Sequence, residues 1–192
     1  MGTDNGLYVS LNRGESWQLM QSGMPHVAVH DLVIQPKARH LLVGTHGRSI
    51  YKADIAPLQD MHREALNTPL VVFELSDIRH SSRWGNSYSV WGTPNTPGLD
   101  IGFYSREGGQ TRATIQSLDG IVLSETEVSA DPGFNVISYD VAFAKSGKQA
   151  YLSQYKTPLT EASNGKTYLP KGSYEVVLEQ GKATAKKSFE IK

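Results

Sequence analysis

The six histidines are the first side chains in this sequence that could bind a metal ion or transfer a proton. His26 and His30 are four residues apart, but a proline and β-branched neighbours place them where a strand begins, and residues i and i+4 of a strand are not adjacent. His30 and Asp31 could act as a base and its orienting group, although consecutive strand side chains point to opposite faces. His40 and His46 flank one predicted strand without a set of carboxylates nearby. We therefore expect no metal site.

Carboxylates were considered as the acid and base of a glycoside hydrolase, which needs two of them about 5–10 Å apart. Sialidases use instead a tyrosine nucleophile and an arginine triad. The candidates are Asp4, Asp31, Asp54, Arg48 and Tyr51. Nothing in their spacing predicts a cluster, and the stretches "GGQTR" and "SNGKT" do not match a phosphate-binding loop. We expect no catalytic residue and no cofactor in this chain.

The stretch "SSRWGNSYSVWGTPN" is the most plausible contact surface. It places Arg83 beside Trp84 and continues with Tyr88 and Trp91, and arginine with large aromatic residues dominates the energetics of many interfaces. Such a loop could stack on a sugar or contact a protein. In the alternative interpretation, the rings simply seal one end of a folded domain.

Composition limits the classes of protein that need to be considered. The 192 residues are 39% hydrophobic and 20% charged, with 19 basic and 19 acidic residues and no cysteine. These values are typical of a folded globular chain and exclude disulfides and thiolate metal sites. The even charge balance does not favour a nucleic-acid partner. No apolar run approaches the roughly 18 residues that span a bilayer, and the N-terminus has no signal-peptide pattern.

Two similar stretches in the first third of the chain indicate a repeat. "GTDNGLYVS" begins at Gly2 and "GTHGRSIYKAD" begins at Gly44, 42 residues later. This spacing is typical of four-stranded propeller blades, which repeat every 40–45 residues or so. Alternating apolar residues predict strands between the two copies, at Val29–Pro36, His40–Thr45 and Arg48–Ala53.

The turn after the first copy carries a recognisable motif. Ser10, Asn12, Gly14, Ser16 and Trp17 resemble the Asp-box of BNR repeats, Ser-x-Asp-x-Gly-x-Thr-Trp. A short Asx side chain accepts backbone hydrogen bonds, glycine takes a positive φ, and the tryptophan is expected to be buried between sheets. Asparagine in place of aspartate removes a charge. We therefore expect the motif to be structural rather than ion-binding.

The phrases "VHDLVIQP" and "GTHGRSIY" resemble the closing blade of VPS10/sortilin-like BNR propellers in bacterial exported proteins of glycosyl hydrolase type. The resemblance implies a periplasmic or extracellular parent protein. About one and a half blades are present, whereas propellers close with four to eight. The chain therefore resembles the C-terminal piece of a longer protein, with Met1 an internal or misassigned start, and we expect self-association through unpaired strands.

The rest of the chain predicts a short helix and then a second β domain. Pro57 can begin a helix with an apolar stripe at Leu58, Met61, Ala65 and Leu66, ending before Pro69. Seven strands then follow, with hairpin turns at Asp119-Gly120 and Gly181. They are predicted at Leu70–Leu75, Leu99–Ser105, Thr111–Ser117, Ile121–Val128, Phe134–Val141, Gly172–Glu179 and Thr184–Ile191.

The second domain also resembles a known family. "TIQSLDGIVL", "DPGFNVISYDV" and "LPKGSYEVVLEQGKATAKKSFEI" are similar to the Ig-like C-terminal domains that follow these propellers and to FlgD-type Ig folds. The prediction is an all-β chain: partial propeller at 1–55, helical connector at 56–69 and Ig-like sandwich at 70–192. The expected function is non-catalytic recognition or scaffolding toward protein or glycan. The alternative is an accessory region of a secreted glycoside hydrolase, similar to sialidases or xyloglucanases, with its catalytic residues in absent blades.

Overall fold

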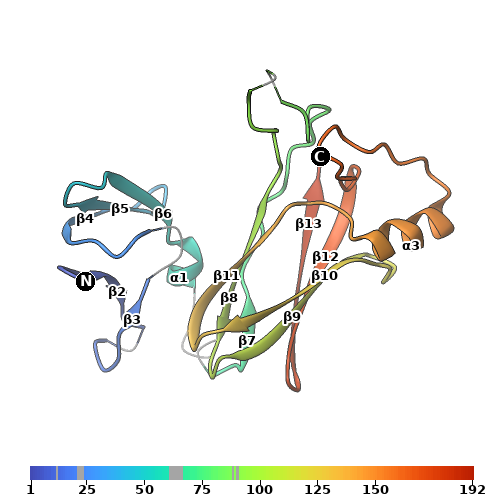
Figure 1. Ribbon diagram of the computed structural model, residues 1–192. Coiled ribbons are helices and arrows are strands. Elements are labelled where there is room, and N and C mark those ends of the chain that lie inside the picture. Colours follow the sequence, from blue (N-terminus) through green and yellow to red (C-terminus); the bar gives the residue numbers. More distant parts are fainter. Residues whose placement is uncertain (12, 21–23, 61–66, 88, 90) are drawn as a thin grey trace. The chain divides into compact units, whose positions relative to one another are not determined.

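The computed structural model describes residues 1–11, 13–20, 24–60, 67–87, 89 and 91–192. The chain divides into two compact units, Met1–Thr68 and Pro69–Lys192 (Figure 1). In the described residues, the strands form antiparallel sheets that do not close into a barrel, and the helices are short. The all-β class predicted from the sequence is confirmed.

The first unit contains two three-stranded sheets. One has the order β1-β2-β3, with strands at Gly2–Thr3, Gly6–Val9 and Gln18–Leu19. The other has the order β4-β5-β6, with strands at Val29–Gln35, His40–Thr45 and Ile50–Asp54. The three strands predicted between residues 29 and 53 are therefore present, each within two residues of its expected bounds.

A small core holds the first unit together. Leu7, Val29 and Val43 are buried, and Leu32 and Tyr51 are among the half-buried side chains around them. β4 contributes Val29 and the half-buried Leu32 to this core, and β5 contributes Val43 and the half-buried Leu41. Gly2 lies so close to β4 that a Cβ there would be 2.6 Å from Cγ1 of Val29. A larger residue at position 2 would force the two strands apart.

The second unit has a four-stranded sheet opposite a three-stranded one. The first has the order β10-β9-β12-β13 and the second the order β11-β8-β7. The strands are β7 (Leu70–Val72), β8 (Leu99–Ser105), β9 (Gly109–Ser117), β10 (Val122–Ala130), β11 (Gly133–Tyr139), β12 (Gly172–Gln180) and β13 (Ala183–Ile191). All seven match predicted strands. The turns at Gly120 and Gly181 have the positive φ expected of them.

The inner faces of these two sheets share one hydrophobic core. Every second residue of β8 is buried, from Leu99 to Ser105, and packs against residues of β9, β12 and β13. A polar link crosses this core: the hydroxyl of Ser105 is 2.7 Å from Oε1 of Gln180, whose amide donates to Oγ1 of Thr111 at 2.8 Å. Buried polar groups paired in this way keep both sheets in register.

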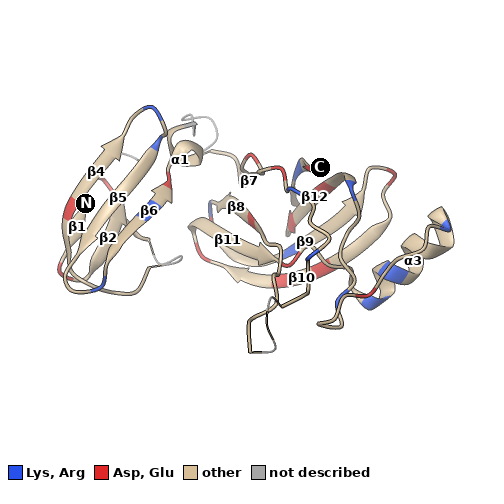
Figure 2. Ribbon diagram, turned by 90° about the horizontal axis from the view of Figure 1, so that it is seen from above, with Lys and Arg blue, Asp and Glu red and all other residues tan. Residues whose placement is uncertain are grey.

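Two helices are described. α1 (Ala56–Asp60) begins where Oδ1 of Asp54 accepts the backbone N–H of Ala56, so the predicted connector helix starts as expected. Its predicted residues Met61, Ala65 and Leu66 lie outside the described residues. α3 (Lys145–Tyr155) was not predicted. It lies beside β10, and its lysines give it a basic surface (Figure 2).

Candidate functional site

Two loops of the second unit enclose a hollow of about 500 Å³. One loop leads from β7 toward β8 and contributes residues 80–82, 84 and 86, and the other follows α3 and contributes residues 158–163 and 168–170. The volume lies in the range of small-molecule sites, about 300–1,000 Å³. The lining combines aromatic rings with hydroxyl, amide and carboxylate groups.

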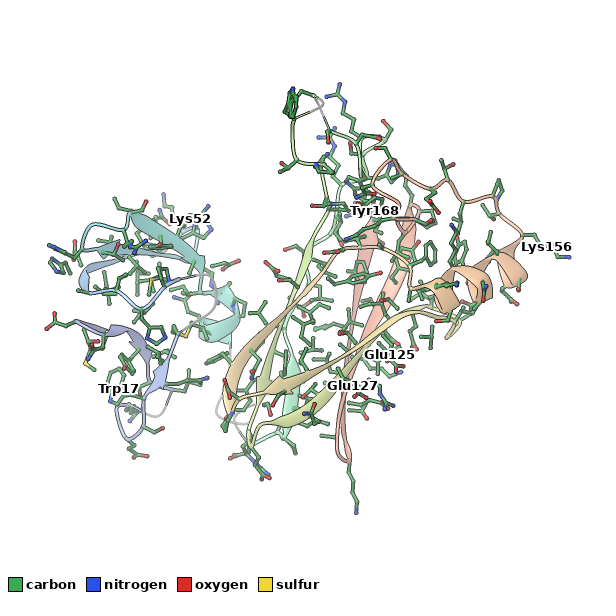
Figure 3. All side chains as sticks on the ribbon, viewed as in Figure 1. Trp17, Lys52, Glu125, Glu127, Lys156 and Tyr168 are labelled. Carbon is green, nitrogen blue, oxygen red and sulfur yellow. The ribbon has the colours of Figure 1, made fainter. Side chains whose placement is uncertain are left out.

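Three rings form the apolar wall of this hollow. Trp84 is only 7% exposed and stands between His80 and Tyr168, with centroid distances of 4.9 and 5.8 Å and tilts of 59° in both cases. Tilted rings at such distances attract one another through their quadrupoles. The half-buried ring of Tyr168 is labelled in Figure 3, and its hydroxyl accepts a hydrogen bond from Nδ2 of Asn164 at 2.7 Å.

A glycine allows the two loops to meet. Gly85 has φ +76°, and a Cβ at this position would lie 2.4 Å from Cβ of Ala162. Its N–H donates to the carbonyl of Asn95, and Asn95 donates back to Asn86. The loop that carries Trp84 is thus closed on itself and pressed against the loop that carries Tyr168.

Polar groups surround the rings. The hydroxyl of Ser163 lies 2.9 Å from the carbonyl of Gly85 and 2.7 Å from Oδ1 of Asn86, so it can donate to either. Glu161 forms a 3.4 Å ion pair with Lys148 of α3, and its carboxylate is mainly exposed. This arrangement can hold a ligand by packing and hydrogen bonds.

The predicted contact loop is split by the structure. Trp84 is a core residue, which matches the interpretation that its ring seals one end of the domain. Trp91 is 96% exposed and Arg83 is exposed as well. Tyr88 lies outside the described residues. The loop therefore offers one buried and one exposed tryptophan, rather than a continuous aromatic surface in the part that is described.

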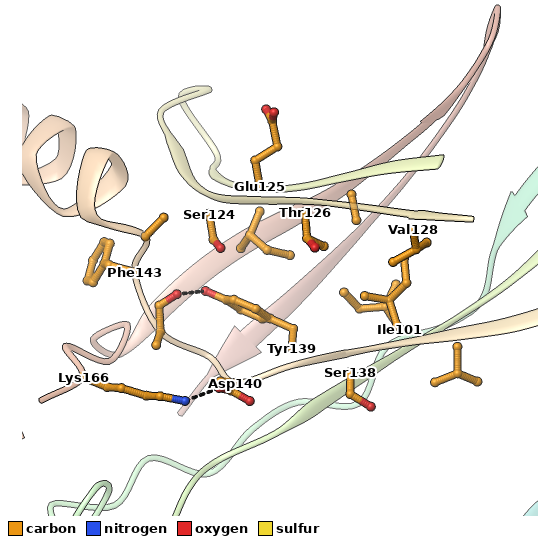
Figure 4. A pocket seen from close by; sticks show the side chains of 16 residues that line it. Ile101, Ser124, Glu125, Thr126, Val128, Ser138, Tyr139, Asp140, Phe143 and Lys166 are labelled. Carbon is orange, nitrogen blue, oxygen red and sulfur yellow. Dashed lines mark hydrogen bonds and ion pairs between the residues drawn. The ribbon is translucent and has the colours of Figure 1, made fainter. Parts of the chain in front are cut away.

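A second hollow opens between the two sheets, beside β10 and β11 (Figure 4). Its volume is about 560 Å³. Tyr139 crosses it and donates its hydroxyl to the carbonyl of Ala142 at 2.6 Å, while Lys166 pairs with Asp140 at its margin. The remaining lining of this hollow combines core side chains such as Ile101 and Ile115 with polar ones such as Ser124 and Thr126.

The Asp-box residues form a turn between β2 and β3. The hydroxyl of Ser10 accepts the backbone N–H of Gly14 at 2.7 Å, and Gly14 has φ +95°. Asn12 lies outside the described residues, and Ser16 is exposed. Trp17 is 47% exposed, so the expectation that it is buried between sheets is wrong for this chain. Partial exposure follows because the first unit has no further sheet beside this turn in its described part.

The carboxylate candidates have separate local roles, whereas the rings of two histidine candidates, His30 and His46, lie side by side. Asp54 begins α1, and Asp31 accepts the N–H of Leu32. Among the described residues, no three His, Cys, Asp or Glu side chains are close enough to hold an ion. One expectation is corrected: a register shift between Val29 and Asp31 leaves both His30 and Asp31 exposed, so these neighbours do not alternate across the strand.

The side of the main hollow that the segment after α3 contributes was not anticipated from the sequence. It includes Thr160, Glu161, Ser163 and Tyr168. The stretch "SNGKT" begins with Ser163, which lines this wall. Its turn signals predict a loop, but nothing in the sequence indicates that it meets a loop about 80 residues earlier.

Comparison with known proteins adds little to this geometry. No protein-family model matches the sequence, and no curated protein matches it. A solved structure titled as a β-glucosidase involved in saponin metabolism from intestinal bacteria is 11% identical, with a TM-score of 0.29. The match covers 65% of this chain and 16% of that one. In the described residues, no helix has the length and apolar character needed to cross a membrane.

Proposed function

We propose that this chain is a non-catalytic recognition module that holds a carbohydrate in the hollow beside Trp84 and Tyr168. Sugars present apolar C–H faces and a rim of hydroxyls, so a ring wall surrounded by hydrogen-bonding side chains suits them. The decisive observation is this pairing of the Trp84–Tyr168 wall with Asn86, Glu161 and Ser163 in one hollow of about 500 Å³.

The proposal includes a parent protein. The resemblance to BNR propellers and to Ig-like domains supports an exported, recognition or scaffolding role in the periplasm or outside the cell. In the described residues, no cluster of three carboxylate or histidine side chains supports a reaction. A protein ligand at the same hollow is the rival outcome of the experiment that follows.

The test is a screen of the chain against immobilised glycans, followed by calorimetric titration with the best ligand. Tyr168→Ala should weaken binding about tenfold or more, equivalent to about 1.4 kcal/mol. Glu161→Gln should weaken binding less; because Glu161 is exposed, this variant keeps the fold. Trp91→Ala is the matched control and should bind normally.

Two results would contradict the proposal. One is a screen without any bound glycan. The other is a loss of binding in Trp91→Ala while Tyr168→Ala, checked for folding by circular dichroism, binds as the parent chain does. That second result would transfer recognition to the exposed part of the loop.

A further inference from the structure

Two histidines of the first unit lie side by side on its surface. His30 is in β4, and His46 directly follows β5. Their ring centroids are 5.0 Å apart and the planes are tilted by 34°. Both side chains are exposed, and the backbone N–H of His46 donates to the carbonyl of Ala28 at 2.9 Å. The neighbouring backbone is therefore fixed where the two imidazoles meet.

A β-bulge in β4 lies at this pair of histidines. Val29 pairs with Thr45, whereas Asp31 pairs with Gly44, so His30 is the additional residue on β4. Val29 and Leu32 remain in the core of the unit, and His30 and Asp31 are both outside. Bulges commonly re-aim a side chain in this way, and they are frequent next to functional sites. The bulge leaves Asp31 on the exposed side together with His30, where regular alternation after His30 would have turned it inward.

The geometry points to a surface site for a divalent transition-metal ion, bound by the two imidazoles of His30 and His46. Metal–nitrogen bonds are about 2.0–2.1 Å, so two imidazoles on one tetrahedral or square-planar ion have ring centroids about 4.5–5.2 Å apart. The distance of 5.0 Å lies in this range. Imidazole suits copper, nickel and zinc, and Cu²⁺ should bind most tightly of the three.

The remaining ligands of the ion are water. Asp31 is exposed on the same bulge, but its Oδ1 accepts the N–H of Leu32 and the described residues contain no trio of metal-binding side chains. A two-histidine site at the surface should bind reversibly and should not be needed for folding. This inference concerns the first unit alone and does not depend on the carbohydrate proposal.

The test uses the full chain, purified without a histidine tag, titrated separately with CuCl₂, NiCl₂ and ZnCl₂ by calorimetry. One ion per chain is expected, with the affinity for Cu²⁺ the highest. His30→Ala and His46→Ala should each weaken Cu²⁺ binding about tenfold or more, because the second imidazole binds intramolecularly. His26→Ala is the matched control, an exposed histidine of the same unit, and should bind as the parent chain does.

Electron paramagnetic resonance of the Cu²⁺ complex gives an independent readout. Hyperfine coupling to two nitrogens is expected in the parent chain and to one nitrogen in either single variant. Equal affinity in His30→Ala, His46→Ala and His26→Ala would overturn the proposal and leave the two rings as a simple aromatic contact. The absence of any saturable binding would overturn it as well.

Discussion

The surroundings of Tyr139 in the second unit change the pKa of its phenol. Its phenol lies in the interior and donates to the carbonyl of Ala142. Burial raises the pKa of Tyr139 far above its usual value, and the charges of Tyr174 and Asp140 raise it further. Burial also raises the pKa of Tyr174. The fold therefore requires both phenols to stay neutral.

This requirement predicts a loss of stability at alkaline pH. A group whose pKa is higher in the folded than in the unfolded chain stabilises the fold fully below its unfolded pKa, about 10 for tyrosine, and progressively less above it. Tyr139→Phe should cost about 0.5–1.5 kcal/mol at pH 7 through the lost hydrogen bond. This difference should shrink as pH rises above about 10, because phenylalanine cannot ionise. Thermal unfolding of both proteins from pH 7 to 11 measures it, and a constant difference would show that Tyr139 does not titrate with unfolding.

Single residues also mark the limit of sequence-based prediction. Trp84 and Trp91 stand in the same Gly- and Ser-rich stretch and have similar neighbours, yet one is buried and the other almost fully exposed. The difference arises because a loop from residues 158–170 covers only Trp84. The residues next to Trp84 in the sequence do not indicate this distant contact. The presence of aromatic residues in the loop could therefore be predicted, but the burial of Trp84 could not.

At the scale of elements, predictability follows the pattern of apolar residues. The strands were predicted because their side chains alternate between core and solvent, as in β8. α3 was missed because "KSGKQAYLSQY" has no apolar stripe, and its buried residue is Gly147. Contacts with residues far away in the sequence hold this helix in place instead. Ala144 donates to the carbonyl of Leu123, and Tyr155 donates to Asp119 of the β9–β10 turn.

Close packing of α3 against β10 makes Gly147 indispensable. A Cβ at this position would lie 2.0 Å from the carbonyl oxygen of Leu123, which is backbone and cannot move aside. Gly147→Ala should destabilise the second unit by about 2–4 kcal/mol, although alanine is the better helix former. Gln149→Ala, at an exposed position of the same helix, should change stability by less than about 0.5 kcal/mol. Urea unfolding followed by circular dichroism compares them, and equal stability of both variants would mean that α3 can shift away from β10 at little cost.

At the scale of the whole molecule, each unit has its own core. The large core cluster contains residues between Leu70 and Ile191, and the small one contains residues between Leu7 and Tyr51. The first unit buries few large side chains and leaves apolar ones exposed on the β4-β5-β6 sheet. Val33 of β4 pairs with Leu42 of β5, and Ile50 of β6 pairs with Gly44, two residues further along β5. Ile50 is 73% exposed. Surfaces of this kind, next to unpaired strand edges, favour association.

These features give physical support to the expected self-association of the chain. Light scattering across a dilution series should show a dimer or larger species whose mass falls on dilution, because the net charge of zero opposes contact only weakly. Leu42→Lys and Ile50→Lys each place a positive charge among the exposed apolar residues of the β4-β5-β6 sheet. Each variant should therefore shift the equilibrium toward monomer by about tenfold or more. Val122→Lys adds the same charge to an exposed apolar residue of the second unit and should leave the mass unchanged.

A monomer at every concentration would show that the free edges and exposed side chains of the first unit are tolerated in water. A mass that falls only in Val122→Lys would place the contact on the second unit, where β10 is an edge strand of its sheet.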